Sequence, residues 1–176
     1  MFPSLRGRPL RAALILLALG ATTASTASAK SHHDTERVVV RGTDVVAEGS
    51  CDATGCELPL TDGAFRGTLG TGGYTGTIKL QLPDAYPNGE GGLCAPVKGR
   101  IVLGAGSPDR LALAIAGDSC QDGAGPVNQA SFTGLADWTV VYGTGAYAHA
   151  RGHGTGTFVE GADDREQMTM IGRIAR

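Results

Sequence analysis

Aromatic side chains are scarce in this sequence of 176 residues, which contains four Phe, four Tyr and one Trp beside 28 Gly. A chain of this kind has many turns and few large core side chains. It has no basic patch and a formal charge of −2, which argues against a nucleic-acid partner. No ten-residue stretch shows apolar residues at helical spacing without an interrupting Gly, so the pattern predicts a β protein with little helix.

A long hydrophobic run is also missing. The longest one, residues 12–19, is less than half of the roughly 20 residues that a membrane-spanning helix needs. It follows a basic stretch that ends at Arg11 and precedes Ala27-Ser28-Ala29, the layout of a secretory signal. We therefore predict that residues 1–29 are a signal peptide cleaved before Lys30, and that the mature protein is secreted and has no membrane partner.

The remaining 147 residues carry 12 basic and 17 acidic side chains, a formal charge of 12 − 17 = −5. This length suits one hydrophobic core and makes a second domain unnecessary. We expect a polar, flexible tail over residues 30–36 and a single β domain over residues 37–176.

Only four cysteines are present, and in an oxidising compartment they allow three pairings. Two apolar segments, 97–103 and 110–116, flank the turn-rich residues 104–109 and predict a β-hairpin. If the hairpin is symmetric about Ser107, Leu103 faces Leu111 and Cys94 faces Cys120. Opposed residues lie at nearly the separation that a disulfide needs. The expected disulfides are Cys94–Cys120 and Cys51–Cys56. A zinc site is the less favoured alternative, because no His lies at ligand spacing and export disfavours free thiolates.

Alternation within the hairpin assigns its two faces. Ile101, Leu103, Leu111, Leu113 and Ile115 share the predicted core face. The opposite face holds Lys98, Arg100, alanines and the two cysteines, so we expect the disulfide on the outer, more solvated face.

Further strands are expected along the whole chain. They cover residues 37–48 (one or two strands), 64–69, 74–82, 131–142, 154–159 and 167–174, with a turn at 71–73 and turn-rich loops at 83–92 and 121–128. The total is about eight strands. Interior glycines such as Gly76, Gly134 and Gly172 suit the curvature of a closed sheet. The predicted fold is an all-β, antiparallel eight-stranded barrel stapled by disulfides, and a β-sandwich is the alternative.

Residues 143–152 read Gly-Thr-Gly-Ala-Tyr-Ala-His-Ala-Arg-Gly. This segment resembles the glycine-rich segment of the dirigent and allene oxide cyclase barrel superfamily, which has Gly-Thr-Gly, an aromatic residue and Ala-Arg-Gly in this order. The resemblance covers about ten residues. It implies an eight-stranded antiparallel barrel, often oligomeric, with an apolar cavity that in some members guides cyclisation or radical coupling. The acidic and arginine residues of those cavities have no match here, so no catalytic residue is carried over.

Several polar residues are candidates for chemistry. Cleavage before Lys30 would place His32 third in the mature chain, where it and the new amine can bind Cu(II) or Ni(II). His149 and His153 flank the glycine-rich segment. A hydrolase is not favoured, because the cysteines are expected to be bridged and no Gly-x-Ser-x-Gly occurs.

Acidic residues offer two more candidates. Asp118, Asp122 and Asp137 would form a carboxylate site only if folding brought them together, and we interpret them as loop and surface acids. The segment from Asp84 to Ala95 matches a calcium loop poorly, because Pro87 interrupts it and Ala95 replaces the final Glu.

Three functions remain open from the sequence. The favoured one is a binding protein that holds a small apolar ligand inside the barrel or a partner at its loops, with Trp138, Tyr142, Tyr147 and Phe158 as candidate ligand-binding residues and no cofactor. The first alternative is a cyclase-like or dirigent-like enzyme that acts through the shape of its cavity. The second is a structural extracellular component, and the balance favours a protein without enzymatic activity.

Overall fold

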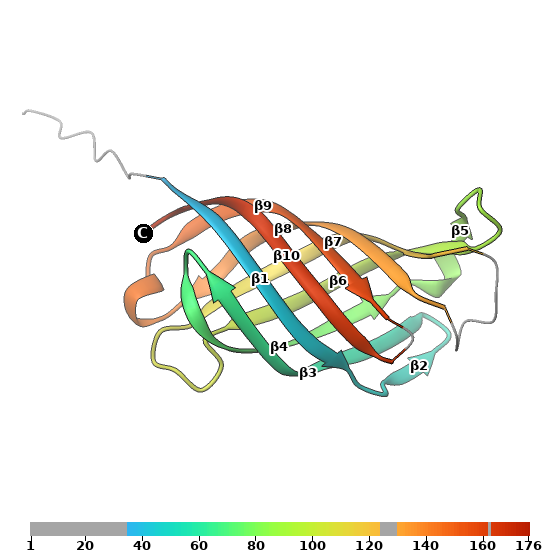
Figure 1. Ribbon diagram of the computed structural model, residues 1–176, viewed down its shortest axis with the longest axis horizontal. Coiled ribbons are helices and arrows are strands. Elements are labelled where there is room, and N and C mark those ends of the chain that lie inside the picture. The colour runs from blue at the N-terminus through green and yellow to red at the C-terminus, as the bar shows by residue number, and fades with distance from the viewer. Residues whose placement is uncertain (1–34, 124–129, 162) are drawn as a thin grey trace, which may run out of the picture. The chain divides into compact units, whose positions relative to one another are not determined.

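A computed structural model describes residues 35–123, 130–161 and 163–176, and the predicted signal peptide and His32 lie outside these ranges. Eight long antiparallel strands form a closed barrel, which confirms the predicted fold (Figure 1). They are β1 Glu36–Val46, β3 Gly55–Gly67, β4 Gly70–Leu80, β6 Leu93–Leu103, β7 Leu111–Gln121, β8 Phe132–Gly143, β9 Arg151–Glu160 and β10 Arg165–Ala175. Closure comes from β1, which pairs with β10 on one side and β3 on the other.

Each long strand pairs with the next one along the chain, so the barrel is an up-and-down meander. Two short strands, β2 Ser50–Asp52 and β5 Tyr86–Pro87, extend beyond it, with the 3-10 turns η1 Leu82–Asp84 and η3 Gly145–Tyr147. We call the end where β1 begins and β10 finishes the terminal end. The opposite end carries β2, β5 and both disulfides, and we call it the disulfide end (Figure 1).

The central hairpin has the predicted register along its whole length. Leu103 faces Leu111 and Cys94 faces Cys120, as symmetry about Ser107 requires. The disulfides Cys94–Cys120 and Cys51–Cys56 are both formed, with Cα–Cα distances of 3.9 and 4.0 Å. On the loop-entropy account, they stabilise the fold by about 3.5 and about 2 kcal/mol, the longer loop contributing more.

One expectation about this hairpin is wrong. The Cys94–Cys120 disulfide lies on the outward-facing row, but Cys94 is buried, with an exposed fraction of 4%. The cause is the segment after η1, in which β5 pairs with β6 at Cys94 and the Asn88 side chain donates a hydrogen bond to the Gln121 carbonyl. The short strand β5 beside Cys94 and the loop that follows it therefore limit the exposure of this disulfide.

The turn predicted at residues 71–73 is also misplaced. Those residues belong to β4, and the chain reverses three residues earlier, at Thr68 and Leu69. Gly67 and Gly70 pair with each other across this tight hairpin, and Gly70 has a positive φ of 96° that favours glycine. The run of glycines after Gly70 is extended strand.

The middle of the barrel is filled around a single indole. Trp138 is 2% exposed and its Nε1 donates a 3.1 Å hydrogen bond to the Thr155 carbonyl. Gly154 and Gly172 lie beside it in register on β9 and β10, and a Cβ atom at either would lie within 2.6 Å of the indole. These glycines therefore provide the space for the largest core side chain, a close approach in addition to the curvature that we expected.

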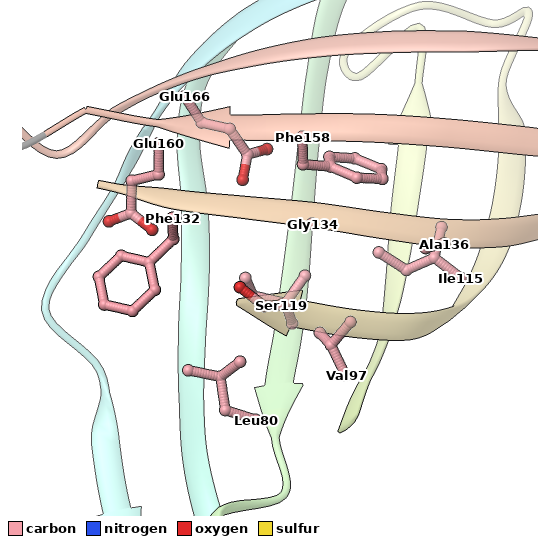
Figure 2. A pocket seen from close by; sticks show the side chains of 11 residues that line it. Leu80, Val97, Ile115, Ser119, Phe132, Gly134, Ala136, Phe158, Glu160 and Glu166 are labelled. Atoms are coloured by element: carbon pink, nitrogen blue, oxygen red, sulfur yellow. The ribbon is translucent and has the colours of Figure 1, made fainter. Parts of the chain in front are cut away.

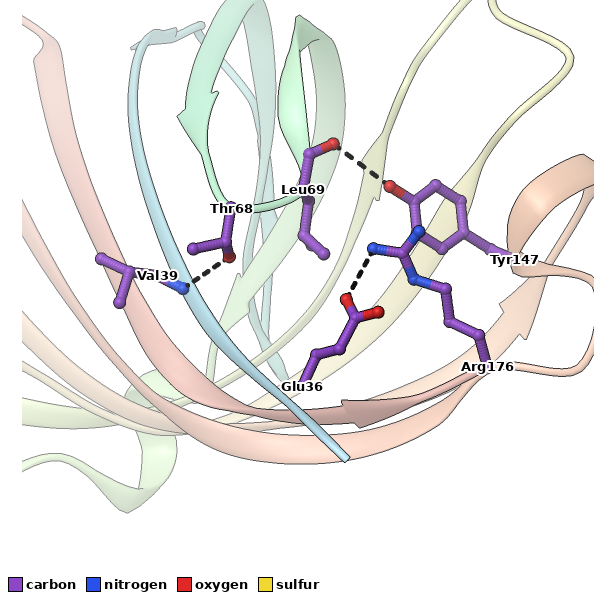
Figure 3. A network of polar contacts seen from close by, with 6 residues as sticks. All are labelled: Glu36, Val39, Thr68, Leu69, Tyr147 and Arg176. Carbon is purple, nitrogen blue, oxygen red and sulfur yellow. Dashed lines mark hydrogen bonds and ion pairs between the residues drawn. The ribbon is translucent and has the colours of Figure 1, made fainter. Parts of the chain in front are cut away.

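The terminal end is closed by a small network of contacts (Figure 3). The Tyr147 hydroxyl donates to the Leu69 carbonyl at 3.1 Å, and the Arg176 guanidinium lies 4.9 Å from the centre of the Tyr147 ring. Arg176 also pairs with Glu36 at 2.9 Å. Glu36, expected in the flexible tail, is thus the first residue of β1. The network joins the start of β1 and the residue after β10 to the loop before β9.

Candidate functional site

A cavity of about 70 Å³ lies inside the barrel at the disulfide end (Figure 2). Most of its wall is apolar, and the polar side chains on it are Ser119 and two glutamates. The lining residues are Ile78, Leu80, Val97, Ile115, Ser119, Phe132, Gly134, Ala136, Phe158, Glu160 and Glu166. The volume is several times the roughly 10–15 Å³ that one water needs, and it is below the roughly 300–1,000 Å³ of sites for drug-sized ligands. It suits a molecule of a few non-hydrogen atoms.

Three carboxylic acids form a row at this end of the barrel. Asp44 on β1 is directly opposite Glu166 on β10, and Glu166 is directly opposite Glu160 on β9. Phe132 on β8 continues the row beside Glu160. Because opposed residues point to the same face of a sheet, the pairing of strands brings all three acids together.

Glu166 is the most buried of the acids that line the cavity, with an exposed fraction of 5%. Burial, and then the charges of Asp44 and Glu160, raise the pKa of its carboxyl to about 8. Burial also raises the pKa of Glu160, with further contributions from Asp164 and Asp44. Near neutral pH, the cavity therefore presents a mainly protonated Glu166 that can donate or accept a hydrogen bond.

Asp44 lies behind this pair and is 4% exposed. Burial raises the pKa of its carboxyl to about 6, and an interaction with the Tyr74 hydroxyl opposes that rise. Both Asp44 oxygens, the Tyr74 hydroxyl and Glu166 Oε1 are buried and have no well-formed hydrogen bond within the protein. Burial raises the pKa of Tyr74 above its usual value, so the hydroxyl stays protonated.

Unpartnered buried polar atoms are uncommon, because each costs about 1–3 kcal/mol of desolvation. Four of them gather around Asp44, Tyr74 and Glu166. Perturbed acids of this kind concentrate at functional sites. The acid row at the rim of an apolar cavity is therefore the candidate site.

A larger hollow, about 430 Å³, lies among the loops of the terminal end and is lined in part by Tyr147, Ser107 and Asp109. Three of its polar side chains have partners within the protein. Asp109 Oδ1 accepts a bond from the Ala146 amide, Ser107 Oγ accepts one from the Asp109 amide, and Tyr147 donates to Leu69. This hollow lacks the unsatisfied groups that mark the cavity at the disulfide end.

Comparison of the chain with protein-family models, curated proteins and solved structures gives no match. The resemblance to the dirigent and allene oxide cyclase superfamily therefore stays a prediction. Its segment forms the end of β8, the turn η3 and the start of β9, at the terminal end.

The four residues predicted to bind ligand do not come together. Phe158 lines the cavity, and Trp138 is packed in the barrel centre. Tyr147 closes the terminal end, whereas Tyr142 is on the outer surface with 52% of its area exposed. Of the four, the structure places only Phe158 beside the acid row.

The other sequence candidates lie outside the cavity. His149 and His153 are exposed at the terminal end, and Asp137 is exposed on the outer wall. Asp122 accepts hydrogen bonds from Ser131, just before β8, and from Thr133 in β8. Asp84 accepts one from Gln81 in the segment compared with a calcium loop.

Sequence reasoning missed the acids that matter, although alternation carried a signal for them. Asp44 follows Val38, Val40 and Gly42 at every second position, on the row that faces the core. Along β10, Glu166 alternates in step with the core residues Met168 and Met170, and along β9, Glu160 alternates in step with Phe158. An acid at a core-facing position in three separate strands was the pattern to look for.

Proposed function

We propose that this chain is exported and that its barrel binds a small, largely apolar molecule in the cavity at the disulfide end. The cavity supports this proposal, since its wall is apolar and its rim carries buried acids without partners. A few polar groups that converge on an apolar pocket are typical of ligand sites. A ligand with one polar group could pair with Glu166 Oε1, which belongs to the cavity wall, while its apolar part packs against the remaining lining.

Export is supported by two observations. All four cysteines are paired, which is usual outside the cytoplasm, and residues 1–29 have the layout of a secretory signal. Among the residues that the structure describes, no helix is long and apolar enough to cross a bilayer.

The test of this proposal is a substitution that fills the cavity. Ala136 lines it, whereas Ala116 is exposed on the outer wall of β7. Ala136→Leu adds three carbon atoms inside, and Ala116→Leu adds the same atoms outside. We expect small alcohols and hydrocarbons to raise the Tm of the wild type and of Ala116→Leu, but not that of Ala136→Leu. An equal response of both variants would contradict the proposal.

One observation favours an enzyme as the second candidate. A carboxyl with a pKa of about 8 beside an apolar cavity is protonated at neutral pH, as a general acid must be. In such a cyclase-like reaction, Glu166 would donate its proton to a substrate oxygen while the walls fix the conformation. Turnover of a bound ligand that Glu166→Gln abolishes without abolishing binding would identify this activity.

A further inference from the structure

The acid row is a costly arrangement. Like charges directly opposite each other destabilise a sheet, and three acids occupy one row across β1, β10 and β9. The ion pairs found within residues 35–123, 130–161 and 163–176 are Arg165–Asp163 and Arg176–Glu36, so neither involves a member of the row. The protein does not offset this concentration of acid with a basic partner there.

A metal ion is a poor fit for this site. In the described part of the chain, no three His, Cys, Asp or Glu side chains converge closely enough to hold one. The cavity also has two aromatic side chains, Phe132 and Phe158, and aliphatic walls. Hard divalent cations prefer a shell of oxygen ligands, whereas organic cations are stabilised by carboxylates together with apolar surface and aromatic faces.

We infer that the cavity takes a small organic ammonium ion, the protonated form of an alkyl or aryl amine, whose nitrogen lies between Glu160 and Glu166 and whose hydrocarbon part packs against Phe158 and Val97. The ammonium hydrogens would pair with Glu166 Oε1, which is buried, lines the cavity and has no partner. Asp44 adds negative charge behind Glu166. This inference rests on the proposed function, because it names the ligand class of the same cavity.

The pH dependence of binding follows from the groups around Glu166. These are Asp44 on β1, Tyr74 on β4 and Glu160 on β9, with Asp164 acting on Glu160. Asp62 on β3 and Arg165 on β10 line a hollow together with Asp44 and Glu166. An ammonium ion favours ionised Glu166, so its binding releases a proton below pH 8. We expect its affinity to rise up to about tenfold per pH unit between pH 6 and 8 and then to level off. A neutral molecule of the same shape lacks this dependence.

The experiment titrates the protein with isobutylamine and isobutanol, which match in shape and differ in charge, and follows binding by NMR at pH 6, 7 and 8. We expect the amine to bind at least about tenfold more tightly than the alcohol at pH 8, and the difference to shrink at pH 6. Glu166→Gln should remove that preference and retain binding of the alcohol. Glu57→Gln, the same change at an exposed position on β3, should leave it intact.

Each result separates the inference from the proposed function. Equal or tighter binding of isobutanol at pH 8 would overturn the ammonium assignment and leave an apolar binding site standing. Binding of neither probe would overturn both. If Glu166→Gln does not fold, Glu160→Gln is expected to lower the affinity for isobutylamine relative to isobutanol. The comparison of the two probes on the wild-type protein requires no variant. An amine preference that survives in both variants would also overturn the inference.

Discussion

The two ends of the barrel are built differently. At the terminal end, the Tyr147 hydroxyl donates to the Leu69 backbone carbonyl, and the Arg176 side chain pairs with that of Glu36. The disulfide end is tied covalently, and its interior contains a cavity and acids without partners. The disulfides at that end offset the stability that is lost through the cavity and the buried acids. This arrangement is expected where a binding site lowers the stability of a fold.

The largest effect that we expect is a decrease in the free energy of unfolding with rising pH. It is caused by the buried acids at the disulfide end. The pKa of Glu166 is raised from 4.5 to about 8 on folding, so the folded state binds this proton more tightly than the unfolded state. The stabilisation is fully present below about pH 4.5 and is lost as pH rises through about 8. The loss is up to about 5 kcal/mol, and Asp44 adds to it between about pH 4 and 6.

Urea unfolding of the wild type and of Glu166→Gln from pH 4.5 to pH 9 measures this loss. The variant cannot ionise at this position, so we expect it to be more stable than the wild type by a few kcal/mol at pH 9 and similar to it at pH 4.5. Glu57→Gln is the control. A wild-type stability that does not change over this range would mean that the acids of the row are not destabilising.

The second prediction compares two interior glycines. A Cβ atom at Gly172 would lie 2.3 Å from the Trp138 ring, whereas one at Gly134, on the cavity wall, meets nothing closer than 3.4 Å. We expect Gly172→Ala to cost about 3 kcal/mol or more, because it overpacks the barrel centre, and Gly134→Ala to cost less than about 1 kcal/mol. Thermal unfolding measures both, and similar losses would remove the contrast between centre and cavity.

The third prediction compares the loss of one stabilising contact at each end of the barrel, and the hydrogen bond of Tyr147 is expected to contribute the smaller share. Replacing Cys94 and Cys120 together by Ala should cost about 3.5 kcal/mol, since the disulfide closes a long loop. Tyr147→Phe removes the hydrogen bond to Leu69 and should cost about 1 kcal/mol. Chemical denaturation of the two variants measures how much free energy of unfolding each contact contributes. A larger loss for Tyr147→Phe than for the disulfide variant would contradict this prediction.

Some features could be predicted from the sequence because they depend on neighbours along the chain. Alternation identified the strands, and symmetry about Ser107 paired Leu103 with Leu111 and Cys94 with Cys120. Loops were harder to predict. The turn at Thr68 and Leu69 was placed too late because the glycines after it look like turn residues, and the cover over Cys94 comes from a segment whose position depends on the complete barrel.

The sequence by itself determined the strand content, the central hairpin and the pairing of the cysteines, because a two-residue period and a tight turn are local properties. Only the tertiary structure decided where the acids meet. Asp44 and Glu166 are separated by most of the chain, and they become neighbours when β1 pairs with β10 and closes the barrel. Burial then raises the pKa of both carboxyls, and burial depends on how every strand of the closed sheet is packed.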